Sequence, residues 1–263
     1  MNSMIPIKEF AERRRRLMER MAPQSIAIMP AAPERTRNRD VLHPFRQDSD
    51  FFYLSGFDEP EAVLVLIPGR EHGESVLFCR DRDPDKEKWD GARLGPEGAI
   101  EELGFGDAFP MSVIDEILPG MIEGRSRVYY PLGRDQSFDH QVMEWLKIIR
   151  SKVRSGAQPP GELVALEHTL HELRLYKSAA EIKVMAKAAK ISAQAHCRAM
   201  KRAAEGVMEY QLEAELIHEF MSNGARGTAY PSIVGAGANG CVLHYIENSA
   251  PLRAGDLVLI DAG

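Results

Sequence analysis

Short apolar runs alternate with helical patterns over the first 150 residues of the chain. Runs of strand length occupy residues 25–29, 62–67, 76–79 and 127–132. The run at 62–67 is almost continuously apolar, which predicts a strand that is covered on both faces.

Helical spacing of apolar residues marks residues 7–21, 96–103, 112–118 and 136–150. A polar segment at 81–95 is expected to be a loop. Because strands and helices alternate in this way, we expect the first part of the chain to be an α/β domain built in layers.

A second region follows the loop at 155–161 and a short apolar piece at 163–166. Ser178 and Glu181 have the spacing of a capping box, which predicts the start of a long helix. Behind it lies one apolar stripe: Ile182, Met185, Ala186, Ala189, Ala193 and Met200. A further helix is expected at 208–222, ended by Asn223 and Gly224. After it come short β runs with glycine turns.

The change in character near residues 172–177 predicts a domain boundary. We therefore divide the chain into a first domain at 1–172 and a second at 173–263.

Composition narrows the class of protein. The 263 residues are 44% hydrophobic and 27% charged, with a net charge of −6, which is typical of a globular protein and gives no general attraction to nucleic acid. No apolar run approaches the roughly 18–20 residues that span a bilayer. The three cysteines are widely spaced and form no CxxC pair, which favours a reduced, cytoplasmic protein.

Two local patterns favour ordinary structural roles. The basic run at 13–16 has acidic residues on both sides, so we interpret it as a solvated helix face rather than a nucleic-acid patch. His168 and His171 have a spacing that two metal ligands on one helix face can have, but the order is not HExxH.

A literal GxGxxG lies at 235–240, with Asp261 about twenty residues further on. A dinucleotide site needs a helix that starts at the last glycine. The following run, 241–246, is short and β-like, so we interpret the glycines as a tight β connection.

Three residues remain as candidates for chemistry. His244 alternates with apolar neighbours in the run 242–246, a pattern that is more typical of a structural histidine in a strand. Trp89 lies in the polar segment 81–95, where an indole often marks a contact surface. Asp261 ends an apolar run that predicts a buried strand. A carboxylate there either forms a turn or serves as a metal ligand or an acid–base group.

Four stretches together resemble a known family: RQDSDFFYLSGFDEPEAVLVL (46–66), HELRLYKSAAEI (171–182), GARGTAYPSIVGAGANGCVLHYIEN (224–248) and GDLVLIDAG (255–263). They are similar to bacterial aminopeptidase P, the Xaa-Pro aminopeptidases of the pita-bread metallopeptidase family. LHYIEN and DLVLIDAG are the most specific parts of the resemblance.

The resemblance implies an α/β N-terminal domain of the creatinase type, followed by the first part of an α+β pita-bread domain. It implies a metallo-aminopeptidase with two divalent metals, usually manganese, that acts on peptides with proline in second position. Asp261 matches the first metal ligand, and His244 matches an active-site histidine that contacts substrate. Trp89 matches a tryptophan that reaches a neighbouring subunit's active site in homodimers or homotetramers.

The other family ligands, a second Asp, a His and two Glu, would lie beyond Gly263. We therefore expect the 263-residue polypeptide alone to be inactive and to bind metal weakly, and the strand at 257–260 to present an apolar edge. Two alternatives stay open: a prolidase that cleaves Xaa-Pro dipeptides, and a non-catalytic pita-bread binding module.

Overall fold

The computed structural model describes residues 5–263, which divide into two compact units, the first ending at Lys177 and the second running from Ser178 to Gly263. Each unit has its own hydrophobic core. None of the helices in the described part of the chain is long and apolar enough to cross a membrane.

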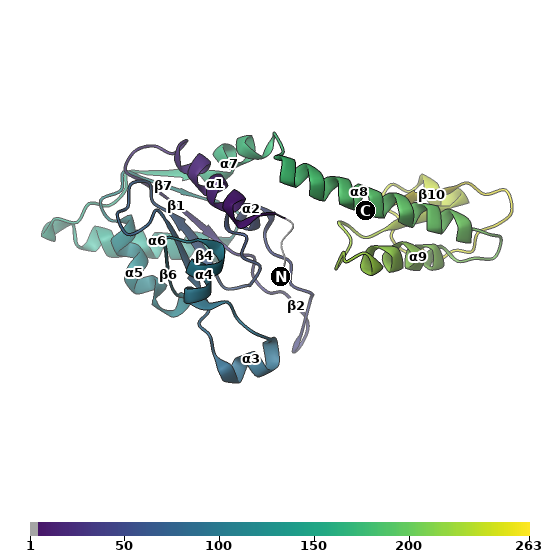
Figure 1. The fold of residues 1–263 in the computed structure, drawn as a ribbon, viewed down its shortest axis with the longest axis horizontal. Helices are drawn as coiled ribbons and strands as arrows, with labels where there is room; N and C mark the ends of the chain where they lie inside the picture. Colours follow the sequence, from purple (N-terminus) through teal and green to yellow (C-terminus); the bar gives the residue numbers. More distant parts are fainter. Residues whose placement is uncertain (1–4) are drawn as a thin grey trace. The chain divides into compact units, whose positions relative to one another are not determined.

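The first unit is an α/β domain (Figure 1). Its helices are α1 (Ile7–Met18), α2 (Ser49–Ser55), α3 (Pro84–Asp90), α4 (Gly95–Leu103), α5 (Ile114–Ile122), α6 (Gln136–Ser151) and α7 (Leu166–Arg174). Its strands are β1 (Ser25–Pro30), β2 (Thr36–Asn38), β3 (Val41–Leu42), β4 (Val63–Leu66), β5 (Ser75–Cys79), β6 (Asp107–Pro110), β7 (Arg127–Tyr130) and β8 (Glu162–Ala165). Single 3₁₀ turns occupy Met111–Val113 and Val153–Ser155.

Six of these strands form one mixed sheet in the order β6-β5-β4-β1-β7-β8. Strand β4 runs antiparallel to β1 and β5, and the other neighbours are parallel. Every residue of β4 is buried, which confirms the prediction of a strand covered on both faces. The pair β2 and β3 forms a separate two-stranded ribbon.

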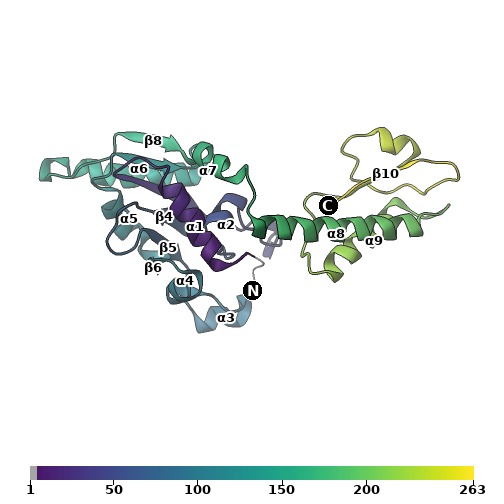
Figure 2. The same ribbon diagram turned by 45° about the horizontal axis from the view of Figure 1, so that its top comes forward.

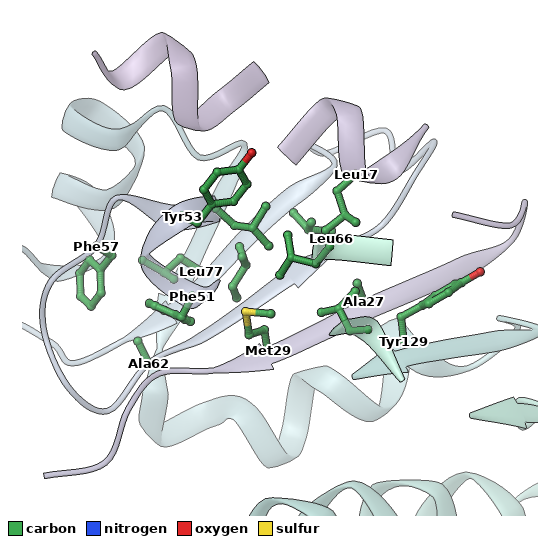
Figure 3. Packing of buried hydrophobic residues seen from close by; sticks show 14 of the residues in the cluster. Leu17, Ala27, Met29, Phe51, Tyr53, Phe57, Ala62, Leu66, Leu77 and Tyr129 are labelled. Atoms are coloured by element: carbon green, nitrogen blue, oxygen red, sulfur yellow. The ribbon is translucent and has the colours of Figure 1, made fainter. Parts of the chain in front are cut away.

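Alternate residues along the strands supply two cores, as the period of two in a strand requires. On one face, Ala27, Met29, Leu64 and Leu66 pack against α1, α2, α4 and α7 (Figure 3). On the other face, Ile26, Ile28, Val63 and Val65 pack against α5 and α6. The unit is therefore a three-layer α/β domain, as the alternating pattern predicts.

The basic run on α1 corrects the interpretation of a solvated face. Arg13 and Arg14 are buried, and Arg14 donates to the carbonyls of Leu54, at 3.0 Å, and Gly104, at 3.1 Å. These carbonyls lie at the C-terminal ends of α2 and α4, where no N–H group of the same helix is available to donate to them. Burial lowers the pKa of Arg14 to about 10. The guanidinium therefore caps two helices, a tertiary role that charge runs do not reveal.

The second unit consists of α8 (Ala179–Arg202), α9 (Glu209–Ser222), β9 (Ile233–Ala236), a 3₁₀ turn at Gly237–Cys241 and β10 (Val258–Asp261). The capping box of Ser178 and Glu181 is present and begins α8. Helices α8 and α9 lie side by side (Figures 1 and 2). Strands β9 and β10 form an antiparallel pair.

The apolar stripe of α8 is not the face that packs inside this unit. Ala195 and Ala199 are the buried residues of α8, whereas Ile182, Met185 and Met200 are more than half exposed. The small alanines allow α9 to approach closely, so α8 has two apolar sides and only one of them is covered within the described residues. Strand β10 is likewise only half-buried, and Leu257 before it is exposed, which corrects the prediction of a buried strand. The apolar edge expected at 257–260 remains a prediction.

Candidate active site

Asp261 stands at the end of β10, where its backbone pairs with Ile233 of β9. Its Oδ1 accepts a hydrogen bond from the hydroxyl of Tyr230, and this carboxylate raises the pKa of Tyr230. Just beyond the strand, the amide of Ala229 donates to the carbonyl of Gly263 at 2.7 Å. Backbone pairing and the tyrosine together hold the Asp261 carboxylate in one place, on an exposed residue.

A carboxylate fixed in this way fits a hard divalent cation as one ligand. Its Oδ2 accepts no hydrogen bond from the described residues. However, residues 5–263 contain no group of three or more His, Cys, Asp or Glu side chains that could hold a metal ion. The described residues therefore do not form a complete metal site by themselves.

His244 lies in an exposed turn after the 3₁₀ segment Gly237–Cys241, and not in a strand as the alternating pattern predicts. The apolar neighbour Leu243 is 85% exposed. Hydrogen bonds of other side chains hold this turn, and its apolar residues Val242, Leu243 and Ile246 are exposed rather than packed in a core. No hydrogen bond or ion pair of the described residues joins His244 to Asp261, although both belong to the second unit.

The loop that carries His244 is held by Glu209, a buried carboxylate that the sequence analysis missed. Its Oε1 accepts from the amide of Ala236 at 2.7 Å and from Asn239 at 3.1 Å. Its Oε2 accepts from Tyr245 at 2.8 Å and from the amide of Ala250 at 2.9 Å. Burial raises the pKa of this carboxyl, but the four donors outweigh burial and lower it overall.

A sequence signal for Glu209 does exist. Leu212, Leu216 and Phe220 are the buried apolar positions of α9, and Glu209 continues the same stripe one turn earlier. A charged residue in an apolar stripe is buried, and a buried carboxylate needs donors. Applied to residues 209–220, this rule would have indicated a hydrogen-bonded site at the start of the helix.

Asn248 anchors the far part of the same loop. Its Oδ1 accepts from the amide of Val234 at 2.9 Å, and its Nδ2 donates to Glu213 of α9 and to the carbonyl of Ser232, both at 2.9 Å. The residue has a positive φ of 46°, a conformation that asparagine tolerates better than most residues. Glu209 and Glu213 are four residues apart, so two successive turns of α9 hold one loop.

The GxGxxG segment is a tight β connection, as the sequence analysis favours. It runs from the end of β9 into a single 3₁₀ turn, and no α-helix begins at Gly240. A Cβ on Gly235 would lie 2.8 Å from the carbonyl carbon of Asn239, so only glycine fits there. The segment 235–240 therefore lacks the helix N-terminus that a phosphate site of the dinucleotide type uses.

Trp89 lies on α3 in the first unit, a short helix where the sequence analysis expects a loop. Asp83 caps this helix with its carboxylate, and none of the helical residues is buried. The indole is 89% exposed. In Figure 1, α3 (blue) stands off from the sheet at the end of two connecting segments.

His168 and His171 lie on α7, and within residues 5–263 they belong to no group of three potential metal ligands. Instead, His171 Nε2 lies 3.1 Å from Oδ2 of Asp50, which also pairs with Arg174 and, at 3.5 Å, with Arg134. Asp50 is buried in α2. The arrangement ties α7 to α2 and supports the structural interpretation of His171.

Comparison with known proteins accounts for both units. The model of the aminopeptidase P N-terminal domain matches residues 10–129, and that of metallopeptidase family M24 matches residues 183–263. The two units of the chain thus match, in order, the N-terminal domain of aminopeptidase P and part of the metallopeptidase domain of family M24. Xaa-Pro aminopeptidase of Escherichia coli (strain K12) is 46% identical over 99% of the chain.

Solved structures agree with this assignment. Pseudomonas aeruginosa aminopeptidase PepP superposes with a TM-score of 0.97 at 62% identity over 98% of the chain. Zinc-substituted E. coli aminopeptidase P in complex with product superposes with a TM-score of 0.96 at 46% identity over 99% of the chain. The chain spans about three fifths of the length of these relatives, 59% of the E. coli and Pseudomonas proteins. The α/β domain is thus an aminopeptidase P N-terminal domain, followed by part of a pita-bread M24 domain.

Proposed function

We propose that the protein containing this chain is a Xaa-Pro aminopeptidase, which releases the N-terminal residue from peptides with proline in second position. The observation that carries the proposal is that one chain contains an aminopeptidase P N-terminal domain followed by an M24 segment. That segment includes Asp261, a carboxylate that is exposed and held in place by Tyr230. The match to a metallopeptidase family supports a metal-dependent hydrolase.

Asp261 is proposed as one ligand of a pair of divalent ions, for which we favour manganese. Carboxylate oxygens suit that hard to borderline cation. When bound, such ions supply Lewis-acid activation of the scissile carbonyl and of water. The part of Tyr230 is to hold the carboxylate in position through its hydroxyl.

His244 is proposed to contact the substrate and to donate a hydrogen bond to the oxygen that gains charge as the carbonyl is attacked. The exposed turn leaves its imidazole accessible to a peptide. Because proline carries no amide N–H, an Xaa-Pro bond offers no donor for recognition. Selection therefore depends on the shape of the proline ring and on the free amino terminus.

The test measures cleavage of Arg-Pro-Pro and of Gly-Pro by a protein that carries this chain together with a complete M24 domain. The proposal predicts release of arginine from the tripeptide, with loss of at least a hundredfold in Asp261→Asn and no change in Glu205→Gln, an exposed carboxylate. Preference for Gly-Pro would instead favour the prolidase alternative. Absence of hydrolysis of both peptides by a metal-loaded protein would favour a binding module.

We also propose a homodimer or homotetramer in which Trp89 reaches the active site of a neighbouring subunit. The exposed indole on the unburied helix α3 supports this proposal. A complementation assay tests it: Trp89→Ala subunits have intact metal ligands, and Asp261→Asn subunits have an intact indole. Mixed oligomers regain activity if Trp89 acts across subunits, and they remain inactive if it acts within its own subunit.

A cytoplasmic location is the last part of the proposal. Cys79, Cys197 and Cys241 are all free thiols in the structure, as expected of a protein from a reducing compartment. Fractionation of the source cells would check this, because recovery in an oxidising compartment would contradict it.

A further inference from the structure

The loop between β9 and β10 contains a long irregular segment, residues 242–250, with His244 near its start. An exposed, irregular segment of this length would ordinarily leave a side chain free to sample many positions. Yet a histidine that donates to a developing charge must be held near its working geometry, because a displacement of about 1 Å can cost about a hundredfold in rate. The question is what holds this segment.

The residue after His244 gives one answer. The hydroxyl of Tyr245 donates to Glu209 Oε2 at 2.8 Å and also accepts from Asn239 Nδ2 at 3.0 Å. Asn239 in turn donates to Glu209 Oε1 at 3.1 Å. The three side chains form a closed ring of hydrogen bonds that fixes the backbone beside His244 against the first turn of α9.

A second clamp lies four residues after His244. Asn248 is buried. It donates to Glu213 of α9 and to the carbonyl of Ser232, and it accepts from the amide of Val234 in β9. The loop then returns to α9, where the amide of Ala250 donates to Glu209 and the carbonyl of Ala250 accepts from the amide of Glu209 at 3.0 Å. Both ends of the segment 245–250 are therefore attached to Glu209, and Asn248 within the segment is attached to Glu213 of the same helix.

We propose that Glu209 and Glu213 are positioning residues for His244, a role that rests on the proposed function of His244. Neither carboxylate contacts the substrate in this proposal. Each acts through the loop: Glu209 through Tyr245, Asn239 and two backbone amides, and Glu213 through Asn248.

The chemistry of the two clamps differs, and this difference sharpens the test. Glu209 uses both oxygens as acceptors, and two of its four donors are backbone amides that cannot turn away. Glutamine replaces one oxygen with a donor group, so Glu209→Gln leaves at least one donor facing a donor. Glu213 accepts from Asn248 with one oxygen only, so Glu213→Gln keeps that bond while Glu213→Ala removes it.

The experiment measures kcat and KM for Arg-Pro-Pro in the protein with a complete M24 domain. We expect Glu209→Gln to lower kcat by about ten- to a hundredfold with KM changed less than threefold, in the range that loss of supporting contacts commonly gives. Glu213→Ala should lower kcat, and Glu213→Gln should restore most of it. The matched control is Glu215→Gln, which removes the same charge from α9 but pairs with Arg198 of α8. It should stay within twofold of the unmodified protein.

A double-variant cycle separates positioning from general damage. If Glu209 acts through His244, then Glu209→Gln in a His244→Ala background lowers kcat less than threefold further. A multiplicative loss would overturn the proposal. Should Glu209→Gln fail to fold, Tyr245→Phe removes one donor and leaves the carboxylate in place, and the same cycle applies.

Failure of the two proposals would look different. If His244→Ala retains full activity, then the proposed role of His244 is wrong, and the proposal that Glu209 and Glu213 position it is wrong as well. If His244→Ala is impaired while Glu209→Gln and Glu213→Ala are both unimpaired, then His244 keeps its role and the positioning proposal alone is wrong.

Discussion

Asp50 at the start of α2 is bound by Arg174 near the end of α7, two residues that lie 124 positions apart in the sequence. His171 and Arg134 approach the same carboxylate. Removing one partner of a buried ion pair lowers stability, because the cation that remains loses its counter-charge. We therefore expect Asp50→Asn to lower the free energy of unfolding by about 2–3 kcal/mol in urea titrations. The control, Asp85→Asn, breaks only an exposed pair with Lys88 and should change stability by less than about 0.5 kcal/mol.

This pair also predicts a dependence on pH. Burial raises the pKa of Asp50, but hydrogen bonds from His171 and Arg174 lower it further than burial raises it, so the folded value lies below the ordinary one. Such a group stabilises the folded state above its unfolded pKa of about 3.9, and this stabilisation disappears as pH falls through the folded pKa. The stability difference between the original chain and Asp50→Asn should be constant from pH 7 to about 5 and shrink below about pH 4. A difference that grows on acidification would contradict the assignment.

Substitutions of Arg14 test whether this one side chain caps both α2 and α4. Replacing it with alanine leaves the carbonyls of Leu54 and Gly104 without a charged donor, and we expect a loss of about 3 kcal/mol. Lysine keeps the charge but lacks the planar fork that reaches two helices, so Arg14→Lys should still cost about 1–2 kcal/mol. Arg16→Ala, at an exposed position of the same basic run, should be nearly neutral. Equal losses for Arg14 and Arg16 in thermal unfolding would show that the cap contributes little.

Two glycine substitutions should have opposite signs. Gly235→Ala places a methyl group 2.8 Å from the backbone of Asn239, so we expect destabilisation of the second unit by about 1–3 kcal/mol. Gly120 lies inside α5 with no atom close to the position of an added methyl group. Gly120→Ala should therefore stabilise by up to about 1 kcal/mol through helix propensity. Circular dichroism melts of both variants would check the signs.

The last prediction concerns metal. Because residues 5–263 contain no group of three or more potential ligands, the 263-residue polypeptide prepared by itself should retain less than one manganese per chain after dialysis and should not cleave Arg-Pro-Pro. Elemental analysis and a peptide assay measure both. Two tightly held ions in the isolated polypeptide would show that the described residues form a centre without further ligands.

The sequence predicts the parts of this fold that depend on local chemistry. The buried strand β4 follows from an uninterrupted apolar run, and the capping box of Ser178 and Glu181 follows from spacing alone. The β connection at 235–240 follows from the lack of a helix-length pattern after the last glycine. Each of these depends on residues close together in the chain.

The features that the sequence analysis got wrong depend on distant partners. Arg14 is buried because two helix ends, 40 and 90 residues away, need a donor. His244 lies in a turn because Glu209, 36 residues before Tyr245, supplies the contacts that a strand would otherwise give. Local periodicity contains no record of such partners, so a short alternating run such as 241–246 is ambiguous.

The hydrogen bonds of Glu209 also imply that positions in the second unit differ in how well they tolerate substitution. Its four donors come from Ala236, Asn239, Tyr245 and Ala250, and loss of one side-chain donor leaves a carboxylate oxygen with its other partner still in place. Loss of the carboxylate, by contrast, leaves all four donors without their acceptor at once. Sequence drift should therefore be freer at Asn239 and Tyr245 than at Glu209, and a deep mutational scan would show more accepted substitutions at these two donors than at the carboxylate.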